Sequence, residues 1–209
     1  MARYIGPSCR QCRRIGEKLF LKGKRCYSDK CAIDRKRLEP GASKGHRRKK
    51  LSDYGMQLIE KQKVKKIYGL LEKQFHSYYV KAAAMPGVTG HSLLGFLEKR
   101  LDNVLFRAGF AVSRTQSRQF VRHGQVTVNG KKVNIPSFQV RVGDVVMIKD
   151  KFRQCQALLD AVGISKGREV PEWMRTELEQ GRVTIAREPQ RSDIGANINE
   201  STVVEFYSK

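Results

Sequence analysis

Four cysteines fall within 23 residues near the N-terminus and restrict what the first 50 residues can fold into. They are Cys9, Cys12, Cys26 and Cys31, spaced Cys-x2-Cys-x13-Cys-x4-Cys. Two close pairs separated by a loop of about 13–20 residues are typical of a tetrahedral zinc site, because each pair supplies two thiolates from one turn. We therefore expect one structural Zn²⁺. Four thiolates fill its coordination sphere and leave no open position for catalysis.

Two disulfides, an iron–sulfur cluster and four unrelated buried thiols are the alternatives for the same residues. The segment Met1–Pro7 lacks the apolar stretch of a secretory signal, so we expect a reducing compartment in which disulfides are rare. Basic side chains surround the cysteines, and their positive field favours thiolate over thiol. A fifth cysteine, Cys155, stands alone and is interpreted as an incidental thiol.

The charge of the chain is large and unevenly distributed. There are 42 Lys and Arg against 20 Asp and Glu, a net charge of +22. The first 50 residues hold 17 basic and 4 acidic side chains, residues 51–150 hold 16 and 7, and residues 151–209 hold 9 and 9. This excess indicates a polyanionic partner near the N-terminal and central parts. The neutral C-terminal part is expected to pack against protein.

Nucleic acid is favoured over a membrane as that partner. The only tryptophan, Trp173, lies in the neutral region, and glycines and prolines interrupt the basic N-terminus, so no amphipathic membrane-surface helix is expected there. No run of about 18 apolar residues would span a bilayer. We expect a cytoplasmic protein without a membrane partner.

Helical periodicity begins after residue 50. Ser52 or Asp53 is the expected cap of a first helix, and a second helix is expected to end before Met85-Pro86-Gly87. A long helix is expected from residue 92 to about 108, followed by one over about 114–123.

Strand patterns follow those helices. Alternating β-branched residues flank Asn129-Gly130, which predicts a tight β-hairpin. Residues 140–148 are expected to form a strand, a turn and another strand. A helical patch at 156–162 and a short final helix capped near Asn199 complete the expected elements. Together they predict an α+β protein.

The sequence shows no catalytic signature. It contains neither a Gly-rich phosphate loop nor the nucleophile or metal motifs of common hydrolases, and its four histidines are scattered. We therefore expect no catalytic residues and no small-molecule substrate.

Residues 100–148 resemble the small RNA-binding module called the S-four domain. The resemblance rests on Arg100–Arg107, on Ser113, Arg114, Arg118 and Gln119, on His123–Gly130, and on Pro136-Ser137 with Gly143-Asp144. Pseudouridine synthases and tyrosyl-tRNA synthetases also contain this module, so it indicates RNA binding only. It implies helices packed on a small antiparallel sheet.

The flanking segments narrow the resemblance to the family of bacterial small-subunit ribosomal proteins S-four. The matching segments are Met1–Pro7, Leu51–Gly55, Glu60–Lys63, Arg191–Ile194 and the ending from Ile198 to Lys209. The resemblance implies three parts. These are a zinc-binding basic arm at 1–50, a helical domain at 51–99 plus about 196–209, and an inserted S-four domain at 100–195.

The resemblance also implies a function. It indicates a structural constituent of the cytoplasmic small ribosomal subunit that binds a multi-helix junction of small-subunit ribosomal RNA and nucleates assembly. It further implies a position where messenger RNA enters, beside ribosomal proteins S-three and S-five, and support of translational accuracy.

Basic side chains are the expected RNA contacts, because they neutralise phosphates and release counterions. Arg114, Arg118 and Arg122 recur every four residues, so we expect them to share one RNA-facing side of a helix. Lys131 and Lys132 extend that surface at the hairpin. The full candidate set is Arg3, Arg13, Arg14, Arg47, Arg48, Lys49, Lys50, Lys61, Lys65, Arg114, Arg118, Arg122, His123, Lys131 and Lys132.

Two other functions remain open from the sequence. One is an RNA-modifying enzyme, similar to a pseudouridine synthase, that carries the same module. The other is a free translational repressor that binds messenger RNA.

Overall fold

The computed structural model describes residues 3–43, 50–165, 167–195 and 197–208. The chain divides into two compact units. Unit 1 comprises Met1–Gly90 with Ala196–Lys209, and unit 2 comprises His91–Gly195. Residues 1–50 thus group with the helical part of the chain in unit 1. Their expected status as a separate arm stays a prediction.

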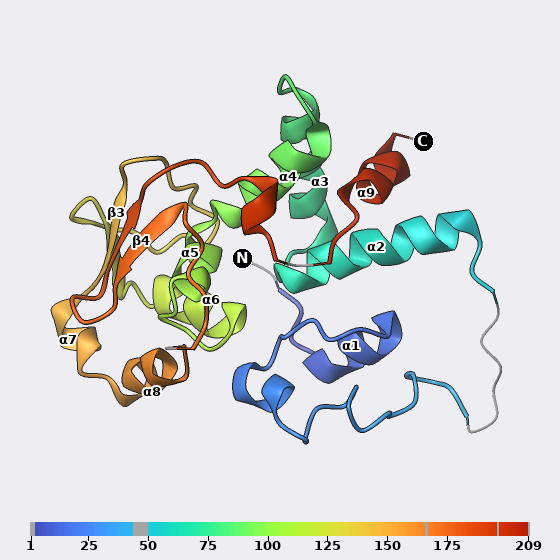
Figure 1. Ribbon diagram of the computed structural model, residues 1–209, viewed down its shortest axis with the longest axis horizontal. Coiled ribbons are helices and arrows are strands. Elements are labelled where there is room, and N and C mark those ends of the chain that lie inside the picture. Colours follow the sequence, from blue (N-terminus) through green and yellow to red (C-terminus); the bar gives the residue numbers. More distant parts are fainter. Residues whose placement is uncertain (1–2, 44–49, 166, 196, 209) are drawn as a thin grey trace. The chain divides into compact units, whose positions relative to one another are not determined.

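Unit 1 is helical. Its elements are α1 (Ser8–Ile15), the 3-10 turn η1 (Gly23–Tyr27), α2 (Asp53–Ile67), α3 (Glu72–Ala83) and α9 (Glu200–Tyr207). The expected cap of α2 is confirmed, because the Ser52 hydroxyl accepts a 3.2 Å hydrogen bond from the Gly55 N–H. Asn199 caps α9 in the same way. The last helix lies along α2 although about 140 residues separate them (Figure 1).

Unit 2 carries most of α4 (Thr89–Glu98), then α5 (Leu101–Arg107), α6 (Arg114–Arg122), α7 (Asp150–Arg153), α8 (Gln156–Ser165) and the 3-10 turn η2 (Arg191–Asp193). The single helix expected from residue 92 to 108 is wrong. Arg100 has an extended backbone, with ψ of 135°, and bridges to Gln139. At this break the Leu101 N–H donates a hydrogen bond to the Phe138 carbonyl instead of to a carbonyl of the preceding helical turn.

The strands of unit 2 form one antiparallel sheet in the order β2-β1-β3-β5-β4. They are β1 (Val126–Val128), β2 (Lys131–Lys132), β3 (Val145–Ile148), β4 (Met174–Glu177) and β5 (Arg182–Ile185). The hairpin at Asn129-Gly130 is confirmed, and both residues have positive φ, 49° and 77°. Of the two strands expected within 140–148, only the second is present. Strands β4 and β5 were not expected.

The two faces of this sheet differ. Helices α5 and α6 cover one face (Figure 1), where Leu101, Leu105 and Phe120 pack against strand residues such as Val126 and Val183. On the other face the side chains of the inner strands β1, β3 and β5 are half-buried, and the register aligns Thr127, Met147 and Arg182 across these three strands. The α+β class expected from the sequence is therefore confirmed for the described residues. None of their helices is long and apolar enough to cross a membrane.

Candidate nucleic-acid interface

Arg118, expected on an RNA-facing helix side, lies in the interior of unit 2. Arg118 is 5% exposed, and its Nη1 lies 3.5 Å from Oδ2 of Asp102. Asp102 also accepts two hydrogen bonds from the fully buried Arg100, at 3.0 and 2.7 Å. The expectation that Arg118 lies on an exposed helix side is therefore wrong, and RNA contact by Arg118 stays a prediction. Its guanidinium joins α6 to α5 through the ion pair with Asp102.

Arg114 is also held within the fold, although less deeply. Its Nε donates a 2.8 Å hydrogen bond to Oδ1 of Asn103, and its guanidinium lies 4.4 Å from the Phe106 ring centroid. The Asn103 amide in turn donates to the buried Glu98 carboxylate, which Arg107 also contacts. Arg114 is half-buried. These contacts orient it, so the repeated arginines do not form one exposed row.

The remaining cations expected in this region are exposed. They are Arg122, His123, Lys131 and Lys132, and they form no ion pair with any described residue. Gly124 ends α6 with a φ of +66°, and a Cβ at this position would come within 2.3 Å of Cε of Lys132. The Lys132 side chain thus lies across the end of α6 and joins the cations of helix and hairpin. We call these four residues the α6–hairpin strip.

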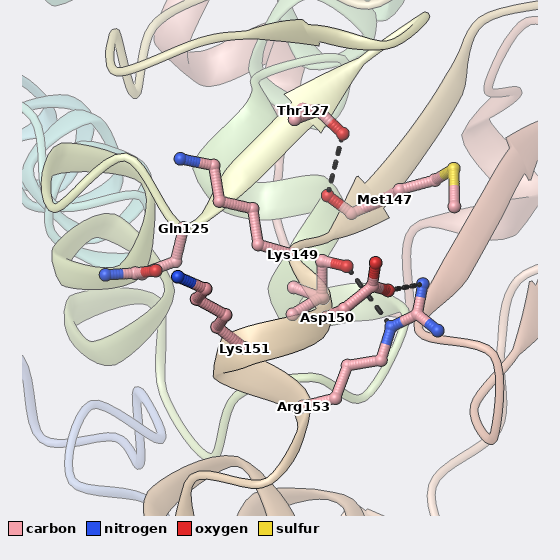
Figure 2. Close-up of a pocket in the computed structure, with 8 residues that line it drawn as sticks. Gln125, Thr127, Met147, Lys149, Asp150, Lys151 and Arg153 are labelled. Carbon is pink, nitrogen blue, oxygen red and sulfur yellow. Dashed lines mark hydrogen bonds and ion pairs between the residues drawn. The ribbon is translucent and has the colours of Figure 1, made fainter.

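A pocket opens beside this strip, at the end of β1 and β3 (Figure 2). Its volume is about 410 Å³, and it is lined by Gln125, Thr127, Met147, Ile148, Lys149, Asp150, Lys151 and Arg153. The Lys149 N–H donates a 3.0 Å hydrogen bond to the Gln125 carbonyl, which fixes the two strand ends together. The residues that line this pocket are not among the RNA contacts predicted from the sequence. Three basic residues that follow β3 closely, Lys149, Lys151 and Arg153, are the sequence signal that could have indicated them.

Two lysines expected to contact RNA in unit 1 have intramolecular partners. Lys61 is 6% exposed, and its Nζ lies 2.8 Å from Oε1 of Glu72 and 4.3 Å from the Phe206 ring centroid. Lys65 lies 2.7 Å from Oε2 of the same carboxylate. Tyr207 donates a third hydrogen bond to Glu72. Lys61 thus has a structural role in unit 1, and Lys65 is half-buried and contacts the same carboxylate. Direct RNA contact by either lysine stays a prediction.

Burial alone would raise the pKa of Glu72. The hydrogen bonds from Lys61, Lys65 and Tyr207 outweigh that effect and lower the pKa to about 2. The same arrangement raises the pKa of Tyr207 well above its ordinary value, through burial first and the hydrogen bond to Glu72 second. The carboxylate is thus ionised and the phenol neutral at physiological pH.

Other unit 1 candidates are accessible. Arg3, Arg14 and Lys50 are exposed, whereas Arg13 donates a 2.7 Å hydrogen bond to the Leu38 carbonyl. Lys66, which the sequence interpretation omitted, has its pKa lowered by burial and then by the charges of Arg14 and Lys65. Burial is the larger cause, and the two neighbouring positive charges add to it. Arg47, Arg48 and Lys49 lie outside the described residues.

The four N-terminal cysteines come from α1, η1 and the turn after it. Cys12, Cys26 and Cys31 are buried, Cys9 is half-buried, and none forms a disulfide. The Lys22 N–H points to Sγ of Cys26 at 3.3 Å. Burial raises the pKa of both Cys12 and Cys26, and the other thiols raise it further, so the sulfurs lie within electrostatic range of one another. Among the described residues, no three His, Cys, Asp or Glu side chains lie close enough together to hold a metal ion.

Comparisons with known proteins cover the whole chain. Residues 3–98 match the family model described as ribosomal protein S4/S9 N-terminal domain, and residues 99–146 match the S4 domain. A small ribosomal subunit protein uS4 from Halothermothrix orenii is 53% identical over 209 residues, which is all of both chains. Proteins of the same name from Citrifermentans bemidjiense and Thermodesulfovibrio yellowstonii are 54% and 50% identical, again over the full length of both chains.

Proposed function

The chain belongs to the uS4 family of small ribosomal subunit proteins, and from that premise we propose that it is a structural, RNA-binding component of the small ribosomal subunit. The observation that carries this proposal is identity of 50% or more with uS4 proteins over all 209 residues. The similarity to known proteins therefore covers both the helical unit and the S4 domain, rather than the RNA-binding module alone.

The distribution of accessible cations supports RNA as the direct partner. Unit 1 presents Arg3, Arg14 and Lys50, and unit 2 presents the α6–hairpin strip. Each cation that contacts a phosphate releases a condensed counterion, so binding gains free energy that depends on salt. Such contacts recognise the shape and backbone of structured RNA.

The finer parts of the role extend this proposal. We expect binding at a multi-helix junction of small-subunit ribosomal RNA early in assembly, in the cytoplasm. The expected position is where messenger RNA enters, beside ribosomal proteins S-three and S-five, with an effect on translational accuracy. These expectations are supported by the family membership and by the neutral C-terminal part.

The N-terminal cysteines support one structural zinc ion as part of the same proposal. Four thiols without disulfides, three of them buried, fit the donor set of a Zn²⁺ site. A bound ion would cross-link Cys9 and Cys12 of α1 to Cys26 and Cys31. It would thereby stabilise a polar segment with few core residues.

The ribosomal role is favoured over an RNA-modifying enzyme, because the full-length relatives named above are ribosomal proteins. Repression of a messenger by the unassembled protein is compatible with the same RNA-binding surface and would be an additional role. Binding to the leader of its own messenger is the direct test of that addition.

Co-sedimentation tests the proposed function. Tagged protein expressed at native level should travel with small subunits through a gradient at high salt, where weak electrostatic contacts dissociate. Its transfer to the free-protein fractions under those conditions would contradict a structural ribosomal role.

A further inference from the structure

The pocket at the end of β1 and β3 has the chemistry of a nucleotide site. Its walls combine the half-buried Met147 side chain with the hydroxyl of Thr127 and the amide of Gln125. The Thr127 hydroxyl donates only a long 3.4 Å hydrogen bond, to the Met147 carbonyl. The hollow has a volume of about 410 Å³ and is open to solvent, so a bound group would lie in it without being enclosed.

Positive charge is concentrated at one side of this pocket. The Lys149 and Lys151 side chains and the Gln125 amide extend to the same side (Figure 2). Neither lysine forms an ion pair with any residue in the described ranges. On the other side Asp150 lies 3.0 Å from Arg153, so the one carboxylate of the pocket is already balanced. Two uncompensated ammonium groups therefore border a partly apolar hollow.

The pocket is continuous with the α6–hairpin strip. Gln125 directly follows Gly124, which ends α6, and Thr127 is paired in register with Lys132 of β2. An RNA strand whose phosphates contact the strip could therefore continue into the pocket without leaving this surface of unit 2.

We propose that this pocket receives one unpaired nucleotide of the bound ribosomal RNA, with its base against Met147 and Thr127 and its flanking phosphates on Lys149 and Lys151. The Gln125 amide can donate to and accept from a base edge. Unpaired bases are the usual targets of specific RNA recognition by proteins. An acidic peptide would use the lysines but would leave the hollow beside Met147 unfilled. The inference rests on the proposed function, since it requires that unit 2 bind RNA.

The first test compares two identical changes on one sheet face. Thr127→Glu places a carboxylate inside the pocket, whereas Thr184→Glu places one on β5, outside it. Each full-length variant is titrated against the small-subunit ribosomal RNA transcript, and accessible bases are probed chemically. Thr127→Glu should weaken binding at least tenfold and re-expose one or a few unpaired bases that the wild type protects. Thr184→Glu should weaken binding less than threefold and keep those protections.

The second test removes charge instead of adding it. Lys149→Gln with Lys151→Gln should reduce the slope of log K against log[salt] by about 1.4, or about 0.7 for each single-strand phosphate contact. The same bases should become reactive. The control, Arg141→Gln with Arg175→Gln, removes two exposed charges of unit 2 outside the pocket. It should leave the protections intact. If circular dichroism shows that Thr127→Glu does not fold, the comparison of these two double variants tests the proposal in its place.

The outcomes separate the two proposals. If the wild type does not bind the transcript, the proposed function fails. If the wild type binds the transcript and each pocket variant behaves like its control, the RNA-binding function stands and the nucleotide pocket is refuted. Normal binding of Thr127→Glu to naked RNA with poor incorporation into assembled subunits would mean that a protein partner fills the pocket, which also overturns the inference.

Discussion

The hydroxyl of Tyr207 donates a 2.6 Å hydrogen bond to Oε1 of Glu72 and so ties the last helix of the chain to α3. The Tyr207 ring also stacks on Tyr79, with 4.6 Å between ring centroids. Because Lys61 and Lys65 contact the same carboxylate, α2, α3 and α9 meet at one ionised group. The C-terminal residues are thus structural parts of unit 1.

Tyr207→Phe should loosen α9 without disrupting its packing. The variant keeps the aromatic ring and removes a hydrogen bond to a charged acceptor, which contributes about 1.5 kcal/mol. Amide hydrogen exchange in α9 should therefore accelerate roughly tenfold. Tyr54→Phe is the matched control, because it removes an exposed hydroxyl from a ring that also packs on α9, at Phe206, and it should exchange as the wild type does. Equal exchange in the two variants would contradict the role of the Tyr207 hydroxyl.

Acid should release the same contact. The pKa of Glu72 falls from its usual 4.5 to about 2 in the folded state. A lowered pKa means that the stabilisation is fully present above about pH 4.5 and is lost as the pH falls towards 2. Carboxyl carbon resonances in NMR should show Glu72 titrating near pH 2 in the wild type and higher in Lys65→Met. Titration of the wild type near pH 4.5 would exclude the three-donor arrangement.

Metal content tests the cysteine cluster. Protein purified under reducing conditions should contain about one zinc per chain, and Cys31→Ser should lose it and become protease-sensitive before residue 45. Cys155→Ser, in unit 2, removes a thiol outside the cluster and should retain the metal. Zinc-free wild-type protein would refute the site.

Local signals in the sequence predicted local structure well. Ser52 is one of the two caps expected for α2, and its hydroxyl accepts the backbone hydrogen bond that a cap accepts. The Asn129-Gly130 turn was identified because few residues other than Asn and Gly adopt positive φ in a two-residue hairpin. These features depend on neighbours only a few residues apart.

Features set by distant residues were missed. The break between α4 and α5 arises because Arg100 bridges to Gln139, a partner 39 positions away. Strand β5 adds to the sheet by pairing with β3, and its own sequence pattern was weak. The burial of Arg118 follows from the position of Asp102 on another helix. A spacing of four residues predicts a shared helix side, but it does not say whether that side faces water or a carboxylate.

The central claim is that unit 2 contacts RNA through exposed cations and keeps Arg118 for its own stability. Arg122→Gln and Arg118→Gln make the same chemical change one helical turn apart. The decisive measurement is the slope of log K against log[salt] on small-subunit ribosomal RNA, with thermal unfolding of each variant alongside. Arg122→Gln should lower the slope by about 0.7–0.9 and change stability by less than about 0.5 kcal/mol. Arg118→Gln should keep the wild-type slope while folded and destabilise unit 2 by roughly 1–3 kcal/mol. A lowered slope for Arg118→Gln with an unchanged slope for Arg122→Gln would contradict the claim.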